Sequence, residues 1–553
     1  MTKLPKKTIQ KLLENSFNLY PERNALAFVG EKPITYSQLR NEIEKVKMLL
    51  HKSGIKKGDK VGLLSTNMPN WGIAFFAIAN FGAIAVPVLP DFHDNEIKNI
   101  IIHSEAKLLI VSEKLFPKVK SLETELLKTK VLLDNFRIIP KEATAEDLKN
   151  LKELSVADIE LENVDIEEDD LLSILYTSGT TGKSKGVMLS HKNIVSNAQN
   201  IITVQYIDKE DSFVSILPLA HTYENTLGLI LPIMQGASVY YLKKPPTANV
   251  LLPALEEIRP TFMLSVPLVI EKIFKKKILT TFTKNIAIKT LYSFPPIRKI
   301  LHKIAGKKLY ETFGGRLKFF GIGGAKVDKT VERFLREAKF PYAIGYGLTE
   351  TAPMLAGSNP QQTKLQGVGP VMQGIEIKIE PQEKGSKLGE VLAKGENIMR
   401  GYFKEPELTK NVFTKDGWFK TGDLGYLTKE NFLYLKGRIK NMIVGPSGEN
   451  IYPEEIESVI NNFNFVLESV VVEKKGKLVA HIHFNYEELE KQFKEMKEDA
   501  MKQMEEKINN LKQEVQLYVN SRVNNFSRVY AIVEQRTPFE KTATQKIKRY
   551  LYH

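Results

Sequence analysis

Short apolar runs alternate with amphipathic stretches along most of the chain before residue 440. Five of these runs have the length and the β-branched composition of buried strands. They are residues 61–65 (VGLLS), 83–88 (AIAVPV), 107–112 (KLLIVS), 171–178 (LLSILYTS) and 213–218 (FVSILP). The amphipathic segments between them are typical of helices that cover a sheet. The pattern predicts an α/β fold with layered, largely parallel sheets.

The pattern changes after Arg438, where a small βα-like segment begins (residues 442–460). A long charged segment follows, with apolar residues at the three- and four-residue spacing of one helix face. These residues are Leu489, Phe493, Met496, Ala500, Met504, Ile508, Leu511 and Val515. The stripe is typical of packing, and a partner helix is the alternative. We therefore expect a large N-terminal domain (residues 1–438) and a small α+β C-terminal domain (residues 439–553).

Composition narrows the class of protein. Of 553 residues, 42% are hydrophobic and 26% are charged, which is ordinary for a soluble protein. The basic N-terminus reads as a first helix and lacks the apolar core of a secretory signal, so we expect a cytoplasmic protein. The chain has no cysteine, which excludes disulfides, thiolate zinc sites and a cysteine nucleophile. Nine histidines without paired spacing do not predict a transition-metal site.

The formal net charge of +14 is concentrated in one segment. Between Lys272 and Lys308 there are eleven Lys or Arg and no acid, interleaved with Leu, Ile, Phe and Tyr. Such a mixture binds anionic lipid surfaces through charge and apolar insertion together. A solvated basic face is the alternative. Nucleic acid is not expected as a partner, because no recognition motif accompanies the charge.

A glycine-rich segment at residues 176–186, YTSGTTGKSKG, ends like a Walker A loop. A Walker A motif would need a glycine at position 177, where this chain has Thr177. Its glycines still permit close phosphate approach, and its hydroxyl, ammonium and amide groups can all donate to oxyanions. We therefore expect phosphate binding by Thr177, Ser178, Gly179, Thr180, Thr181, Gly182, Lys183 and Lys185.

YTSGTTGKSKG resembles the signature loop of the adenylate-forming (AMP-binding) superfamily, which includes acyl-CoA synthetases, luciferases and the adenylation domains of peptide synthetases. The family's other motifs follow in the family's order. They are LPLAHTYE (217–224), GIGGAK (321–326), GYGLTET (345–351), WFKTGDLG (418–425), GRIKNMIVGPSGENIYPEEIE (437–457) and PFEKTATQKIKR (538–549). The resemblance covers essentially the whole chain and is strongest to bacterial long-chain fatty acyl-CoA synthetases.

The resemblance implies two half-reactions. A carboxylate and ATP give an acyl-adenylate and pyrophosphate, and the thiol of CoA then gives the acyl-CoA and AMP. Because negative charge gathers at the α-phosphate, the site must supply cations and hydrogen-bond donors. The implied co-substrates are ATP and CoA, and the implied metal is Mg²⁺.

Position in the family motifs implies a role for individual residues. Glu350 would hold Mg²⁺, with Thr181 as a second contact, and Thr349 would contact phosphate oxygens. His221 would lie on the acyl-binding side. The adenine would contact Gly323, Gly324, Ala325, Tyr346 and Gly347, and the ribose would contact Asp423 and Arg438. Without the resemblance, Asp423 and Arg438 would be read as turn residues.

Lys546 is the catalytic lysine implied for the first half-reaction, where its ammonium would bridge the carboxylate and the α-phosphate. In the family the small C-terminal domain is mobile and turns about a hinge residue, which corresponds to Lys440. The chain departs from the usual pattern at Ser184, Asn441 and Gln545, where the family mostly has proline, aspartate and glycine.

The LPLAHTYE motif and residues 259–274 and 448–457 resemble long-chain fatty acyl-CoA synthetases more than acetate, aryl or amino-acid enzymes. Chain length cannot be read from the sequence. A fatty acyl-AMP ligase or an acyl-carrier-protein ligase would share every adenylation residue. A non-catalytic nucleotide-binding scaffold is a more distant alternative, as is a motor-type ATPase, which would release ADP.

Overall fold

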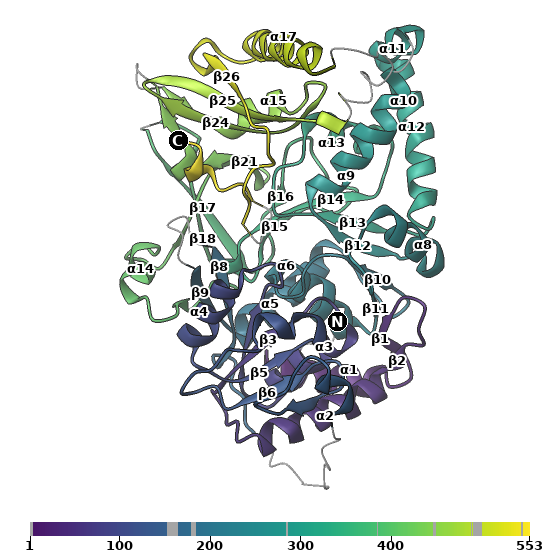
Figure 1. Cartoon of the computed structure of the whole chain (residues 1–553), viewed down its shortest axis with the longest axis vertical. Coiled ribbons are helices and arrows are strands. Elements are labelled where there is room, and N and C mark those ends of the chain that lie inside the picture. The colour runs from purple at the N-terminus through teal and green to yellow at the C-terminus, as the bar shows by residue number, and fades with distance from the viewer. Residues whose placement is uncertain are drawn as a thin grey trace. The chain divides into compact units, whose positions relative to one another are not determined.

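In the computed structural model, the described residues are 4–151, 164–178, 184–283, 286–383, 385–445, 449–487, 489, 500–542 and 546–553. They form two compact units (Figure 1). The first unit is Met1–Ile377, Ala393–Phe419 and Thr428–Leu433, and the second is Lys378–Leu392, Lys420–Leu427 and Tyr434–His553. The predicted boundary at residue 438 lies within the second unit and stays a prediction.

An eight-stranded sheet in the first unit has the order β19-β9-β8-β4-β3-β5-β6-β7. Its strands are β3 (Lys60–Leu64), β4 (Ile84–Val88), β5 (Ala106–Val111), β6 (Thr129–Leu132), β7 (Arg137–Ile139), β8 (Leu171–Ser178), β9 (Ser184–Ser190) and β19 (Gly401–Tyr402). The strands β8, β4, β3 and β5 are parallel neighbours, as predicted, and β8 pairs antiparallel with β9. This sheet contains four of the five strands expected from the sequence.

The second eight-stranded sheet has the order β15-β14-β13-β12-β10-β11-β1-β2. Its strands are β1 (Asn24–Phe28), β2 (Ile34–Thr35), β10 (Ser212–Ser215), β11 (Ser238–Tyr241), β12 (Phe262–Ser265), β13 (Phe319–Ile322), β14 (Tyr342–Gly347) and β15 (Met354–Gly357). The fifth expected strand is β10. The run from β1 to β14 is parallel, and β2 and β15 at the two edges are antiparallel.

Three helices of the first unit begin after residues whose side chains cap them. Thr35 and Gln38 form a capping box before α2, Ser190 and Asn193 form one before α5, and Asp328 caps α13. The helices are α1 (Ile9–Leu19), α2 (Tyr36–Lys52), α3 (Pro69–Asn80), α4 (Asp94–Ser104), α5 (His191–Val204), α6 (Thr222–Glu224), α7 (Leu231–Gln235), α8 (Ala248–Ile258), α9 (Pro267–Ile273), α10 (Thr280–Thr283), α11 (Ile286–Ser293), α12 (Pro295–Thr312), α13 (Lys329–Glu337) and α14 (Pro406–Asn411). The first helix expected from the sequence is α1.

A third sheet has the order β16-β21-β20-β18-β17. Its strands are β16 (Gly369–Pro370), β17 (Ile375–Pro381), β18 (Gly389–Gly395), β20 (Phe419–Leu427) and β21 (Phe432–Arg438). The limits of the two compact units fall within β17, β18, β20 and β21.

The remainder of the second unit is α+β, as predicted. It contains β22 (Ile443–Val444), β23 (Asn450–Ile451), α15 (Pro453–Ile460), β24 (Val466–Lys474), β25 (Lys477–Phe484), α17 (Ala500–Asn520) and β26 (Ala531–Glu534). The strands β24, β25 and β26 form one sheet, and α15 and α17 share an apolar core with it.

The apolar stripe predicted in this unit is a packing face. Leu489, Ile508, Leu511 and Val515 are all buried in the core beside β24 and β25. Phe493 and Met496, and the side chains of Ala500 and Met504, lie outside the described part of the chain. The packing interpretation is therefore confirmed for the four residues that can be placed.

The possibility of a membrane span was tested on the helices. Within the described ranges, no helix combines the length and the apolar character needed to cross a membrane.

Candidate active site

The glycine-rich segment is a β-hairpin. Ser178 pairs with Ser184 and Thr177 pairs with Lys185 across the antiparallel strands β8 and β9. A Walker A loop runs from a strand into a helix, whereas here a second strand follows the loop, so a Walker A loop is excluded. Thr177 Oγ1 is buried and has no hydrogen-bond partner among the described residues.

Several predicted phosphate contacts lie between β8 and β9 in the sequence, outside the described residues. They are Gly179, Thr180, Thr181, Gly182 and Lys183, and the side chain of Ser178 is not described either. Their phosphate contacts stay predictions, as does the metal contact of Thr181.

Lys185, Tyr402 and Glu350 meet on the first unit. The Lys185 ammonium donates to the Tyr402 hydroxyl at 2.8 Å, and that hydroxyl donates to Glu350 Oε1, also at 2.8 Å. Lys185 Nζ lies 3.7 Å from the same carboxylate oxygen and 4.1 Å from the centre of the Tyr402 ring. The structure thus joins two predicted residues through a third, Tyr402, that the sequence did not reveal.

Tyr402 is set by its surroundings as a hydrogen-bond donor. Burial, and then the neighbouring Glu350 carboxylate, raise the pKa of the Tyr402 hydroxyl above its ordinary value, so the hydroxyl keeps its proton. Glu350 therefore accepts a fixed hydrogen bond on one oxygen, and its side chain is 13% exposed. A single carboxylate suits Mg²⁺, which also keeps waters and binds substrate phosphates. The donor set fits the predicted metal.

The turn that carries Glu350 is held by close backbone packing. A Cβ on Gly347, at the end of β14, would lie 1.8 Å from the carbonyl oxygen of Pro353, so only glycine fits. Thr349 and Glu350 follow in a single 3-10 turn, η5 (Thr349–Thr351). The amide of Met399 donates to the Glu350 carbonyl at 2.9 Å and fixes the turn from the opposite side.

The predicted adenine contacts lie at the carboxyl ends of β13 and β14. Gly323 is buried, and a Cβ there would lie 3.1 Å from the Tyr223 ring. Gly324 has φ +85° and, like Ala325, is exposed. Tyr346 is buried within β14. Because β13 and β14 are adjacent and parallel, these residues share one edge of the sheet, where ligands of α/β folds bind.

His221 begins α6, and its ring Nδ1 accepts a hydrogen bond from the Tyr223 amide at 3.2 Å. In the neutral ring the proton is therefore on Nε2. Asn67 orients the preceding loop: its Oδ1 accepts from the Leu219 amide at 2.9 Å, and its Nδ2 donates to the Leu217 carbonyl at 2.6 Å. Asn67 lies about 150 residues earlier in the chain, and no sequence motif indicated it.

Glu224, the last residue of the same motif, is fully enclosed. The Ser215 hydroxyl donates to Glu224 Oε1 at 2.6 Å, and Oε2 has no partner among the described residues. Burial raises the pKa of Glu224 to about 8, against the smaller opposite effect of the Ser215 hydrogen bond. In the sequence, Glu224 is an acid within the largely apolar run LPLAHTYENTLGLILP (217–232), a position that indicates a buried carboxylate.

An apolar cavity of about 30 Å³ lies beside these elements. Its lining includes Tyr223 of α6 and Leu227 of the turn that follows it. Gly321 of β13, Gly345 of β14 and Met354 of β15 also line it. The Met354 side chain fills the space over Gly345, since a Cβ there would lie 2.7 Å from its terminal methyl carbon.

Asp423 and Arg438 belong to the second unit and meet there. Arg438 Nε lies 3.0 Å from Asp423 Oδ1, with the Asp423 side chain 8% exposed and the Arg438 side chain 44% exposed. The preceding Gly422 has φ +72°, and its amide donates to Glu390 Oε1 at 3.0 Å. The two residues predicted to bind ribose are thus brought together.

Lys546 is exposed on a short hairpin of the second unit. Lys541 and Ile547 form a β-bridge, and the Thr542 amide donates to the Lys546 carbonyl at 2.7 Å. Gln545, where the chain departs from the family pattern, lies outside the described residues.

Lys440 lies in the 3-10 turn η6 (Ile439–Asn441) of the same unit. The neighbouring Asn441 stands where the family commonly has aspartate. Its Nδ2 donates to Glu454 Oε1 at 2.6 Å.

Known proteins resemble this chain in sequence and in fold. The family model of the AMP-binding enzymes matches residues 13–403. Fatty acyl-CoA synthetase A of Dictyostelium discoideum is 30% identical over 77% of this chain and 68% of its own length. 4-Coumarate–CoA ligase 1 of Petroselinum crispum is 29% identical over 80% of this chain and 78% of its own.

Among solved structures, o-succinylbenzoate–CoA synthetase of Bacillus subtilis, in complex with ATP and magnesium ion, shares the fold with a TM-score of 0.75. It is 23% identical and covers 98% of both chains. The fold, the family match and the relatives define an adenylate-forming ligase. The chain belongs to the family of AMP-binding enzymes.

Proposed function

We propose that the protein activates a long-chain fatty acid with ATP and transfers the acyl group to CoA. The reaction would release pyrophosphate in the first step and AMP in the second. The observation that carries the proposal is the convergence of the Lys185–Tyr402–Glu350 cluster with the carboxyl ends of β13 and β14 on one unit. The relatives in the comparison are acid–CoA ligases, which supports the reaction class.

The apolar cavity beside β13 and β14 supports a hydrocarbon substrate. Carbon atoms of Tyr223, Leu227 and Met354 and the bare backbone of two glycines form much of its lining. At about 30 Å³ the cavity does not hold a long chain, but methionine is flexible. Rotation of the Met354 side chain away from Gly345 would lengthen the cavity for the acyl chain.

In the first half-reaction, cations and donors counter the charge at the phosphates. Lys185 would donate to the β- and γ-phosphates, together with the hairpin residues before it. Tyr402 would hold both Lys185 and Glu350 in place through its two hydrogen bonds. When bound at Glu350, Mg²⁺ supplies electrostatic stabilisation of the phosphate oxygens. Thr349 would add a hydroxyl donor.

The remaining roles concern the nucleoside, the acid and the hinge. Asp423 would accept hydrogen bonds from the ribose hydroxyls, with Arg438 holding the carboxylate in place. His221, which carries its proton on Nε2, would face the acyl group. Lys546 would bridge the acid and the α-phosphate, and rotation about Lys440 would then exchange it for the CoA thiol.

We also propose that the enzyme takes its acid from an anionic membrane, through the basic segment between Lys272 and Lys308. Long-chain acids are poorly soluble, so a surface that concentrates them favours the reaction. Each basic residue of the segment that reaches such a surface would contribute about 1 kcal/mol.

The proposal is tested by AMP release from purified protein with ATP, Mg²⁺ and acids of increasing chain length, each with and without CoA. We expect thioester formation with CoA and the highest kcat/KM for long-chain acids. AMP release without any thioester would indicate a carrier protein as the acceptor. Release of ADP, or no turnover with any acid, would contradict the proposal.

An aromatic acid is a second candidate, because 4-coumarate–CoA ligases are about as similar to this chain as the fatty acyl-CoA synthetase. The same assay decides between them. A kcat/KM for 4-coumarate above that for every fatty acid would assign the enzyme to aromatic acids.

A further inference from the structure

The surface of α11 and α12 exposes an unusual set of large apolar side chains. Leu291 is 48% exposed, Phe294 56%, Ile300 58% and Ile304 55%. They belong to the basic segment between Lys272 and Lys308. Exposed apolar residues that cluster in this way mark an interaction surface.

Spacing along α12 separates its faces. His302, Gly306 and Leu309 are buried, whereas Ile300 and Ile304, four residues apart, lie together on the exposed side. Lys299 and Lys303 precede them by one residue each and form a parallel exposed row. The helix thus presents an apolar row beside a basic row, which is the pattern of a helix that lies in a membrane interface.

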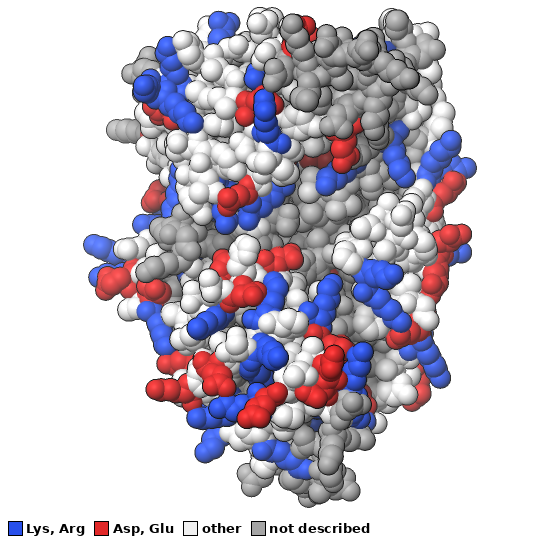
Figure 2. All heavy atoms as spheres, viewed as in Figure 1, with Lys and Arg blue, Asp and Glu red and all other residues white. Residues whose placement is uncertain are grey.

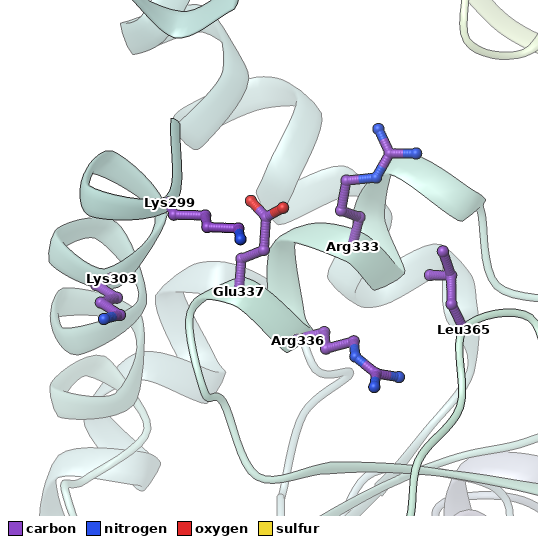
Figure 3. A pocket seen from close by; sticks show the side chains of 6 residues that line it. All are labelled: Lys299, Lys303, Arg333, Arg336, Glu337 and Leu365. Atoms are coloured by element: carbon purple, nitrogen blue, oxygen red, sulfur yellow. The ribbon is translucent and has the colours of Figure 1, made fainter. Parts of the chain in front are cut away.

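A cavity of about 400 Å³ adjoins the basic row. Figure 3 shows Lys299 and Lys303 on α12, with Arg333, Arg336 and Glu337 on α13. The two helices are neighbours within the first unit. Four cationic side chains and one acidic one therefore line the same hollow, together with Leu365.

Glu337, the one acid among the residues that line the cavity, is paired with Arg298, which does not line it. Arg298 donates to both oxygens of Glu337, at 3.1 and 2.8 Å, and His302 Nδ1 lies 2.8 Å from Oε2. Burial alone would raise the pKa of Glu337, but the Arg298 hydrogen bonds hold it below its ordinary value. In the described part of the chain, no acidic group forms an ion pair with Lys299, Lys303 or Arg333. The cavity keeps a net positive charge.

On the face that Figure 2 shows, acidic and basic side chains are interspersed, so that face is not uniformly basic. The four cationic side chains of the cavity form a local site for an anion.

We propose that this cavity binds the phosphate headgroup of an anionic phospholipid while Ile300 and Ile304 enter the interfacial layer of the bilayer. The arginines supply forked donors that match phosphate oxygens, and the lysines supply point charges. The inference extends the proposed uptake of acid at a membrane, but vesicle binding tests it without any turnover.

The test is co-sedimentation with vesicles of phosphatidylcholine alone and with added phosphatidylglycerol. The matched variants are Lys299→Gln/Lys303→Gln, which removes two cavity charges, and Lys307→Gln/Lys308→Gln, which removes two charges of the same helix outside the cavity. Loss of two surface charges alone weakens binding about 30-fold. We expect no more than that from the outer pair and about 10-fold more from the cavity pair. Equal losses would overturn the headgroup site.

A second experiment tests the apolar row of Ile300 and Ile304. Ile300→Ser/Ile304→Ser is expected to lose the binding to phosphatidylglycerol vesicles that survives 0.5 M salt, since salt screens the charges but not apolar insertion. Unchanged high-salt binding, or wild-type binding that does not depend on phosphatidylglycerol, would contradict the proposal. AMP release with a soluble short acid is measured for every variant, so failure of folding or of the proposed reaction is distinguished from failure of docking.

Discussion

Glu350 and Glu224, two carboxylates of the first unit, both lie within family motifs but differ in their hydrogen-bond partners and burial. Glu350 accepts the Tyr402 hydroxyl at 2.8 Å and lies 3.7 Å from the Lys185 ammonium. Glu224 is buried, and within the described part of the chain the Ser215 hydroxyl is the one group that donates to it. Burial raises the pKa of Glu224 and so opposes its charge.

The first prediction concerns Glu224. Its pKa is about 8 in the folded protein and 4.5 as the ordinary value, so the folded state binds one proton more than the unfolded state between these pH values. Stability must then fall as pH rises from about 4.5 to 8, by up to about 1.4 kcal/mol per pH unit from this group. Glu224→Gln removes this slope. Urea unfolding at several pH values measures the dependence of stability on pH. The same dependence in wild type and Glu224→Gln would contradict the raised pKa of Glu224.

The second prediction concerns Tyr402. Tyr402→Phe keeps the ring but removes the hydroxyl that joins Lys185 to Glu350. A lost hydrogen bond to a charged group corresponds to about 10-fold in kcat/KM for ATP. Initial rates of AMP release at varied ATP measure the effect. Tyr206→Phe, at a side chain 68% exposed, is the control and should behave as wild type. An unchanged kcat/KM in Tyr402→Phe would remove the cluster from the mechanism.

At the scale of elements, the segment that follows Lys546 is fixed to α15 through Arg549, which is paired with Glu457 and lies 3.9 Å from Glu454. Arg549 donates to both carboxylate oxygens of Glu457, with Nη1 2.7 Å from Oε1. Glu457 also accepts the Val471 amide at 2.7 Å, so the pair ties this segment, α15 and β24 together. The contact joins the last residue of the lysine motif to the last residue of the motif that spans residues 437–457.

Arg549→Ala is expected to destabilise the second unit by about 3 kcal/mol, because it leaves the buried Glu457 carboxylate without its cation. Lys548→Ala is the matched control. Its ion pair with Glu540 is exposed, 3.7 Å long and worth little. Hydrogen exchange of the β24 amides, measured during thermal or urea unfolding, compares the stability of the two variants. Equal stability of both variants would show that the Arg549–Glu457 pair does not stabilise the unit.

At the scale of the whole molecule, the proposed chemistry is divided between two units. Glu350, Tyr402 and Lys185 belong to the first, and Asp423, Arg438, Lys440 and Lys546 belong to the second. The proposed hinge at Lys440 lies within the second unit, with Asp423 and Arg438 before it in the chain and Lys546 after it, so rotation there would move Lys546 and leave Asp423 and Arg438 in place.

Lys546→Ala is therefore expected to abolish acyl-adenylate formation, by at least about 100-fold in rate, and to leave thioester formation from supplied acyl-adenylate within about threefold of wild type. Single-turnover assays of each half-reaction measure the two rates. Lys548→Ala, in the same segment, should leave both unchanged. Equal loss of both half-reactions in Lys546→Ala would contradict a hinge at Lys440.

Prediction from the sequence succeeded where the signal is local. Strand runs such as residues 171–178 and the packing stripe through Ile508 and Val515 were found because burial leaves a period in the sequence. Asn67 and Tyr402 were missed because nothing near them in the chain marks their partners. Their hydrogen bonds form only when distant segments fold together.

The sequence by itself determined the α/β class, the order of the motifs and the family. Only the tertiary structure decided which side chains meet and how far each is buried. Tyr402 bonds to Glu350 across 52 residues and to Lys185 across 217, and Glu224 acquires its raised pKa from an enclosure built by several elements. Motifs report the chemical type of a residue at a position, whereas hydrogen bonding and desolvation depend on distances between atoms that the chain order does not contain.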